Sequence, residues 1–397
     1  MSPPSSSTSS SEGMSARHRS SPTARGCVAA LFWTLVFLAF ADIAINALFA
    51  MPSDPTQEPR PLQRFFDYGR SIEGKLRLMI GPEDASSHPL LRAAWIDQTA
   101  GSAGEEGWDL ARNGQGLRIA VYGMSFVLNI CREVASLDNT VVLRLLGGPN
   151  APLSHSHALY MRDRGGRGAD VVVLGVLASS VPALHSAAHM TWNFEAPSAY
   201  TYPRYWLAGG RLEQASSPVS SLKDLRAALL DPARWRAFRN DLRQQDAFFS
   251  PSLFDATVLD RSAIVRILRR SLAHRSKRAV IDRFHDEHGF RAKSGIVELA
   301  GALAVDFARA VNEDGSTPVI LLINDLGYGD HLFRALAPAL DAAGIAYVST
   351  HEMAPVTDPA NFVGDGHFTK ITERVIAEQL LATIRLARSR LSPQGNW

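Results

Sequence analysis

An acid and an imidazole stand two residues apart near the end of the chain, in the segment GDGHFTK at residues 364–370. Residues i and i+2 of an extended segment point the same way, so Asp365 and His367 should project from one side of the chain. A carboxylate in this position can orient an imidazole and stabilise its protonated form, as a general base in nucleophilic catalysis requires. Because Asp-x-His is frequent in ordinary loops, the pair predicts catalysis only where a nucleophile lies beside it.

The candidate nucleophile is Ser125, in the segment YGMSF at residues 122–126, where an apolar run ends and a helical pattern begins. The first N–H groups of a helix point at whatever lies above such a hydroxyl and can stabilise an oxyanion. Serine is also an ordinary N-cap residue, so Ser125 alone is weak evidence. We expect His367 to accept the proton of Ser125 and Asp365 to orient His367, a triad recognised by roles rather than by chain order.

Five short apolar runs are expected to position these side chains. They are rich in β-branched residues and apolar at nearly every position, which is typical of strands buried on both faces. They lie at residues 117–124, 140–147, 169–178, 317–325 and 344–350. Helical patterns separate them, so we expect a parallel sheet with helices on both sides. In such sheets reactive groups gather beyond the carboxyl ends of the strands.

Other polar residues follow the second and third predicted strands. Gly147 and Gly148 allow close approach to the backbone, and Asn150 offers a side-chain amide. Ser179 and Ser180 follow the third strand and offer hydroxyl groups. Each also has an ordinary interpretation, since Gly-Gly-Pro-Asn favours a turn and serine is common in loops.

Together these segments resemble the SGNH (GDSL-like) hydrolases, in the branch whose last block is Asp-x-His. The likeness covers residues 117–184 and 316–386, and includes YGMSF, the glycine after the second strand, and GDGHFT before the final helical pattern VIAEQLLATI. It implies a three-layer α/β/α, flavodoxin-like fold that cleaves or transfers acyl esters without a cofactor. It also implies Ser125 as nucleophile and N–H donor, Gly148 as second N–H donor, His367 as base and Asp365 as its orienter.

The chain departs from that family at two positions. Met124 replaces the acidic residue of Gly-Asp-Ser, and no Gly-x-Asn-Asp block follows the third strand. Asn150, Ser179 or Ser180 would therefore have to supply the missing oxyanion donor. The alternative function is a catalytically inactive scaffold or glycan-binding subunit of an envelope complex.

A metal site is the rival chemistry. His155 and His157 also stand two apart, and with Asp365 and His367 they offer imidazole and carboxylate ligands for a divalent ion. A metal needs four convergent groups, and nothing in the sequence brings these loops together. We therefore expect no metal.

The N-terminal part indicates membrane attachment. Residues 1–25 are rich in serine and proline and are predicted to be a disordered cytoplasmic tail, whereas residues 26–51 are apolar over the length needed to cross a bilayer. Arginines precede this segment, so the positive-inside rule predicts a single-pass anchor in the inner membrane with a periplasmic C-terminal domain. A cleaved signal peptide is the alternative. Asp42 and Asn46 lie one helical turn apart, and we favour snorkelling to the interface over a partner helix in the membrane.

The outer part divides into residues 52–116, a linker with membrane-proximal helices, and residues 117–391, the α/β domain with a mostly helical insertion at about 185–300. An amphipathic helix is predicted at residues 64–80. The cations of the insertion are expected on a solvated helix face rather than at lipid phosphate or an acidic polymer, and they are Arg266, Arg269, Arg270, Arg275, Lys277, Arg278 and Arg283. The aromatic residues of YTYPRYWL, residues 200–207, are expected in the core rather than in a sugar platform.

Composition limits the partners. The formal net charge is +2, so no polyanion such as nucleic acid is implied, and the two cysteines, Cys27 and Cys131, lie too far apart in sequence to suggest a disulfide framework. The sequence therefore predicts a membrane-anchored serine ester hydrolase or O-acyltransferase. Its expected substrate is an acyl ester, with esters of envelope or exported polysaccharide as the specific hypothesis.

Overall fold

The computed structural model describes residues 24–54, 57–80, 88–101, 108, 116–164 and 168–391. The predicted disordered tail, residues 1–25, lies outside this part of the chain except for its last two residues.

A five-stranded parallel sheet lies at the centre of the fold, in the order β2-β1-β3-β8-β9. The strands are β1 (Leu117–Gly123), β2 (Val141–Gly147), β3 (Val171–Leu177), β8 (Thr317–Ile323) and β9 (Ala346–Ser349). Every residue of β3 and β8 is buried, as the unbroken apolar runs predict. The α/β class and the parallel sheet are confirmed.

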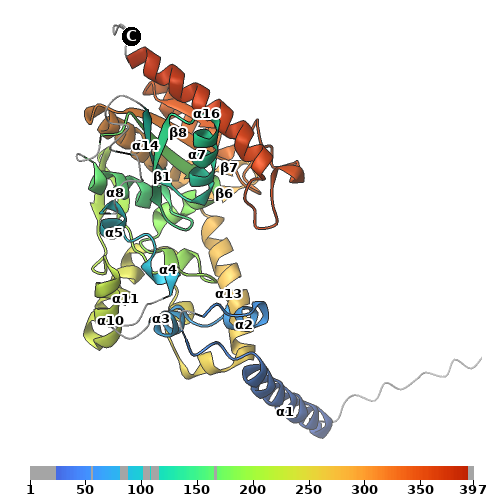
Figure 1. The fold of residues 1–397 in the computed structure, drawn as a ribbon. Helices are drawn as coiled ribbons and strands as arrows, with labels where there is room; N and C mark the ends of the chain where they lie inside the picture. Colours follow the sequence, from blue (N-terminus) through green and yellow to red (C-terminus); the bar gives the residue numbers. More distant parts are fainter. Residues whose placement is uncertain are drawn as a thin grey trace, which may run out of the picture.

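Helices cover both faces of this sheet (Figure 1). On one face α7 (Ser125–Leu137) and α16 (Lys370–Leu391) pack side by side over the strand residues that point their way, such as Ile119 and Val121. The alternate strand residues, such as Ala120 and Tyr122, pack instead with helices on the other face. These are α8 (Leu153–Asp163), α14 (Ile296–Glu313) and α15 (His331–Ala342). The two faces thus anchor the helices that begin at the carboxyl ends of the strands.

A third core forms where the segment between β3 and α14 packs against α3 (Ile72–Met79) and α4 (Pro89–Arg92). The helices of the segment between β3 and α14 are η2 (Ala178–His185), α9 (His189–Trp192), α10 (Leu222–Leu230), α11 (Pro232–Gln245), α12 (Pro251–Phe254), η3 (Val258–Arg261), α13 (Ala263–Ile281) and η4 (Ala292–Ser294). Two small antiparallel pairs, which the sequence did not suggest, are β4 (Arg204–Ala208) with β5 (Arg211–Ala215), and β6 (His285–Asp286) with β7 (Gly289–Phe290). The tyrosines of YTYPRYWL are buried, so the core interpretation is confirmed for them.

The N-terminal helix α1 (Ala24–Leu48) contains a candidate membrane span, Arg25–Leu48, with a mean hydropathy of 2.3 and no burial of its most apolar window. A signal sequence passes the same test, so α1 alone does not separate the two alternatives. It is followed by α2 (Pro61–Asp67), α3 (Ile72–Met79), α4 (Pro89–Arg92) and α5 (Ile96–Ala100).

The single amphipathic helix predicted at residues 64–80 is wrong. The chain breaks between α2 and α3, where Gly69 lies directly against the backbone of Arg266 and a side chain would overlap it. Ser71 then starts α3 by accepting a hydrogen bond from the N–H of Gly74 at 3.0 Å.

The cations of α13 also differ from the prediction. Arg266 and Arg269 are only 4% and 7% exposed, so they do not belong to a solvated face. Arg270 pairs with Glu195, and the ammonium group of Lys277 lies over the ring of Trp192. The solvated-face interpretation holds for the remaining three, which are Arg275, Arg278 and Arg283.

Candidate active site

Ser125 is fixed by the close packing of α7 on the sheet. It is the first residue of α7, and the extended residue Met124 before it is fully buried. A side chain at Gly175 in β3 would lie 2.5 Å from the Cβ of Val127, so this glycine lets the first turn of α7 approach the strand. The hydroxyl of Ser125 is therefore held at the carboxyl end of β1.

A tight loop before α16 presents His367. Phe362 and Phe368 pair as an antiparallel bridge, and the N–H of Val363 donates to the carbonyl of His367 at 2.8 Å. Between them the N–H of Gly366 donates back to the carbonyl of Val363 at 2.9 Å, with φ of +89° at Gly366. Only glycine adopts this conformation without strain, so the glycine between the two reactive residues has a structural purpose.

The loop brings three predicted residues together. The Oγ of Ser125 lies 2.7 Å from the Nε2 of His367, although the two residues are 242 positions apart. The Nδ1 of the same ring lies 3.1 Å from the Oδ1 of Asp365, which also accepts the N–H of His367 at 3.1 Å. A proton on Nδ1 directed at the carboxylate leaves Nε2 as the acceptor for the hydroxyl of Ser125.

Aromatic packing fixes the imidazole plane. Phe126 stacks on the ring of His367 with centroids 4.5 Å apart and planes inclined by 20°, and its other edge meets Phe368. Sequence reasoning missed Phe126, although its place directly after the candidate nucleophile was visible. Stacking on one side and a hydrogen bond at each nitrogen leave the ring little rotational freedom.

The site is open to solvent on the carboxylate side. The side chain of Asp365 is 69% exposed and that of His367 is 31% exposed. Hydrogen bonds from the backbone and then the ring of His367 lower the pKa of Asp365 below its ordinary value, so the carboxylate is charged near neutral pH.

The expected oxyanion donors are less completely arranged. The N–H of Gly148 donates to the carbonyl of Gly123 at 3.2 Å, so the second backbone donor is already engaged. The N–H of Ser179 donates to Asp325 at 3.1 Å, and the hydroxyl of Ser180 to the carbonyl of Leu177 at 2.8 Å.

Two kinds of expected donor are not engaged by these contacts. The first N–H groups of α7 have no acceptor within a helix, and Met124 supplies no side-chain cap. Asn150 is exposed and has a φ of +49°, a left-handed conformation that asparagine tolerates better than most residues. Its amide is the side-chain donor that the loop after β2 offers.

Asp325 is a titratable residue that sequence reasoning missed. It lies two residues after β8, in the segment LLIND, and its carboxylate accepts the N–H of Ser179, two residues after β3. Burial raises the pKa of Asp325 to about 6, against the opposing effect of the hydrogen bonds from Ser179. Its position after a buried strand was the available signal.

The four candidate metal ligands do not converge. His155 and His157 are buried on α8, where His155 Nε2 lies 2.8 Å from the carbonyl of Ala94. His157 lies between the hydroxyl of Tyr205 and the carboxylate of Asp306, at 3.1 and 2.9 Å. Across the residues that the structure describes, no group of three or more His, Cys, Asp or Glu side chains is arranged to hold a metal.

Comparison with known proteins gives no family. No protein-family model matches the chain, and no curated protein matches it. The candidate activity therefore depends on the geometry of Ser125, His367 and Asp365.

Proposed function

We propose that this protein is a membrane-anchored serine ester hydrolase or O-acyltransferase, with Ser125 as nucleophile, His367 as general base and Asp365 as the residue that orients His367. The observation that carries the proposal is the 2.7 Å contact between the Oγ of Ser125 and the Nε2 of His367. A hydroxyl within hydrogen-bond reach of an imidazole, itself held by a carboxylate, is the arrangement that activates serine for acyl transfer.

The sheet supports this location. Numbered within the sheet, its strand order is 2-1-3-4-5, the order of flavodoxin-like folds, so the order reverses between β1 and β3. Ligands of open α/β sheets bind at this switch point, beyond the carboxyl ends of the strands. Ser125 follows β1 there. A three-layer, flavodoxin-like SGNH fold is accordingly the family that we propose.

The reaction has two balanced steps. The Oγ of Ser125 bonds to the ester carbonyl carbon while its proton passes to the Nε2 of His367, and the alkoxide then leaves with that proton. Water or an acceptor hydroxyl next attacks the acyl-serine, giving its proton to Nε2, and Oγ recovers the proton as its bond to carbon breaks. Water gives hydrolysis, and an acceptor hydroxyl gives acyl transfer.

The proposed anchor is α1, with the part of the chain that follows α1 on the outer side of the inner membrane. The arginine at its start and the apolar length of Arg25–Leu48 support this orientation. An exported or envelope polysaccharide that carries acyl esters is the proposed substrate, because the exposed carboxylate side of the triad leaves room for a polymer.

The test uses the full-length chain in detergent, with p-nitrophenyl acetate as substrate and a fluorophosphonate as covalent label. Ser125→Ala should abolish both hydrolysis and labelling. The matched control is Ser136→Ala, an exposed serine on the same helix, which should leave both unchanged. Labelling that survives in Ser125→Ala would reject the nucleophile.

A second function is a glycan-binding or scaffold subunit that keeps the fold without turnover. The engaged N–H of Gly148 favours it, because a hydrolase of this kind needs a free donor for the oxyanion. It predicts polysaccharide binding that is equal in the native chain, Ser125→Ala and His367→Ala, with no acyl-enzyme trapped. Ester turnover that requires Ser125 rejects this second function.

A further inference from the structure

Two polar residues of the apolar helix α1 bind the start of α13. The Oδ1 of Asp42 accepts from the hydroxyl of Ser262 and from the N–H of Ile264, both at 2.9 Å. One turn later, the Oδ1 of Asn46 accepts from the Nη2 of Arg266 at 2.9 Å. Both side chains therefore have partners within the same chain, and their expected position near the outer interface stays a prediction.

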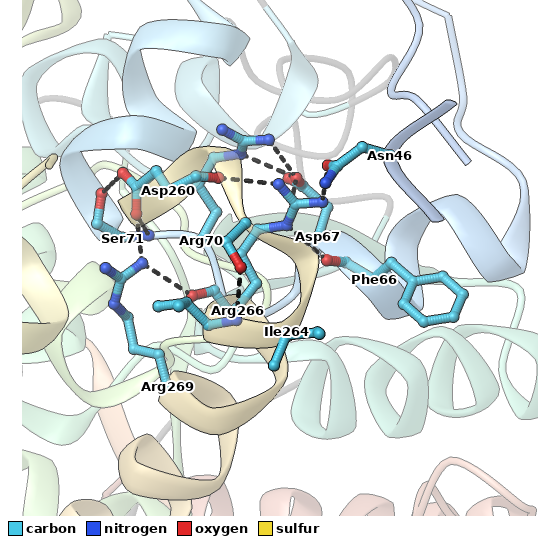
Figure 2. Close-up of polar contacts among 12 residues, drawn as sticks. Asn46, Phe66, Asp67, Arg70, Ser71, Asp260, Ile264, Arg266 and Arg269 are labelled. Atoms are coloured by element: carbon cyan, nitrogen blue, oxygen red, sulfur yellow. Dashed lines mark hydrogen bonds and ion pairs between the residues drawn. The ribbon is translucent and has the colours of Figure 1, made fainter. Parts of the chain in front are cut away.

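A buried polar cluster continues these contacts into the body, and Figure 2 shows its members converging between α2, α3 and α13. Arg266 donates to the carbonyls of Phe66 and Asp260 at 2.7 and 2.8 Å. Asp260 also pairs with Arg269 and accepts the hydroxyl of Ser71 at 2.5 Å. Because Arg266, Asp260 and Arg269 are all buried, the cluster holds the start of α13 in one position relative to α2 and α3.

The end of α1 is held on a second side. The ring of Phe49 stacks on that of Phe66 with centroids 5.0 Å apart, and Gln63 donates to the carbonyl of Ala50 at 2.6 Å. Contacts with both α2 and α13 define how far the body stands from the membrane that α1 enters.

The length of α1 places this junction at the membrane surface. The 24 residues of Arg25–Leu48 measure about 36 Å at 1.5 Å per residue, whereas a hydrocarbon core is about 30 Å thick, or about 20 residues. A span that begins at Arg25 therefore leaves the hydrocarbon near Ile45. Asp42 and its partners Ser262 and Ile264 lie within one helical turn of that boundary.

Apolar side chains are exposed around the same junction, and in Figure 1 the segment leading into α13 lies at the lower edge of the body beside α1. Val258 and Leu259 in η3 are 78% and 53% exposed, only a few residues before Ser262. On α2, Leu62 and Phe65 are 55% and 42% exposed, next to the Phe66 that stacks on Phe49. We call these four residues the apolar base.

Cationic residues border the apolar base. Arg60 precedes α2 and Arg261 ends η3, and both are exposed. Apolar side chains that enter the acyl boundary beside cations that meet headgroup phosphates are the pattern of interfacial membrane binding.

We propose that the apolar base is seated in the outer leaflet of the membrane that α1 spans, so that a lipid surface is its partner. The seating rests on the proposed anchor and not on the proposed ester chemistry. Val258 and Leu259 enter the acyl boundary, and the contacts of Asp42 and Asn46 hold them at that depth. The α/β body is thereby fixed to the bilayer at two places instead of being tethered by a single helix.

The experiment reads the depth of single cysteines in full-length protein reconstituted into phosphatidylcholine vesicles. The background is Cys27→Ala, since the remaining Cys131 is buried and burial raises its pKa to about 12, which suppresses labelling. An environment-sensitive fluorophore is placed separately at Val258→Cys, Leu259→Cys and Leu62→Cys. The matched controls are Leu230→Cys and Ile371→Cys, which are 84% and 80% exposed but lie on α10 and α16.

Probes on the apolar base should show blue-shifted emission, and most of their fluorescence intensity should be quenched when the lipid acyl chains carry bromine. Probes at the two control positions should show neither effect. A probe at Ile43→Cys, exposed on α1, reports whether the anchor itself is in the bilayer. Quenching at Ile43 with none at Val258, Leu259 or Leu62 would reject the seating of the apolar base but support α1 as an anchor. No quenching at Ile43 would reject both the anchor and the seating. Ester turnover, measured on the same vesicles, tests the proposed function independently of the seating.

Discussion

At the carboxyl edge of the sheet the three candidate residues are partly or largely exposed, and two of them come from one short loop. At the start of α13 the charged groups are buried, and some of their partners lie far away in sequence. Asp365 is 69% exposed and bonds a residue two positions on. Asp260 is 5% exposed and bonds Ser71, 189 positions earlier. Water can solvate a group left unpaired at the first region but not at the second. Changes at the carboxyl edge should therefore alter the proposed chemistry, and changes at the buried polar cluster should alter stability.

The largest expected effect is on chemistry at the exposed edge. Ser125→Ala should lower kcat/KM for an ester by on the order of 10³-fold or more, because it removes the proposed nucleophile. Its melting temperature should match that of the native chain, since a partly exposed hydroxyl is all that is lost. Steady-state kinetics and calorimetry on one preparation check both halves, and a large fall in melting temperature would blur the contrast between the regions.

The next largest effect is on stability, at the buried polar cluster that includes Asp260 and Arg269. Asp260→Ala leaves the guanidinium of Arg269 without its carboxylate, and should lower the free energy of unfolding by about 3–5 kcal/mol. Replacing both Asp260 and Arg269, by Leu and Met, should recover most of this loss, because the guanidinium of Arg269 is then no longer left buried without a partner. The matched control is Asp282→Ala, whose pair with Arg278 is exposed and should change stability by less than about 1 kcal/mol. Equal losses of unfolding free energy in Asp260→Ala and Asp282→Ala would contradict the expected difference between buried and exposed ion pairs.

This contrast explains what the sequence could predict. The strands were predictable because each is an unbroken apolar run, and Ser125 and His367 because each lies where a run or loop meets a helix start. The convergence of these two residues follows from the rule on carboxyl ends of strands, applied to local patterns.

The buried polar cluster at the start of α13 was not predictable by the same means. In the sequence, Arg266 and Arg269 resemble any cations on a helix. The carboxylate that pairs with Arg269 belongs to Asp260, nine positions earlier in the short helix η3. The interpretation as a solvated face was therefore wrong for both. The β4-β5 hairpin was missed for a related reason, since Arg, Glu and Gln in its strands hide the usual alternation.

His155 extends the comparison to pH. Burial lowers its pKa from 6.5 to about 4, with a smaller opposing effect from its hydrogen bond to Ala94. Between these pH values the unfolded chain binds a proton at His155 that the folded chain excludes. The contribution of His155 to the free energy of unfolding is therefore fully present above pH 6.5, and it is lost as the pH falls to about 4. The slope from this residue is up to about 1.4 kcal/mol per pH unit.

Denaturant unfolding at several pH values measures that slope. His155→Gln keeps a donor for Ala94 and should flatten the pH dependence by the contribution of one residue. The exposed His288→Gln should not flatten it, because that side chain is 86% exposed. A slope that is unchanged in His155→Gln would show that the residue is not held neutral by burial.

The smallest expected effect is again at the carboxyl edge, where Asp365 is solvated. Asp365→Asn keeps the shape of the residue that orients His367 and removes its charge. Because Asp365 is 69% exposed, water screens much of its influence on the imidazolium, and kcat/KM should fall by only about tenfold. The hydrogen bonds from the backbone and ring of His367 hold the pKa of Asp365 below its ordinary value, so the carboxylate stays charged and the advantage of the native chain should not change with pH near neutrality. A fall on the order of 10⁴-fold, as for a buried triad carboxylate, would mean that bound substrate covers Asp365 and makes the open site a closed one during the reaction.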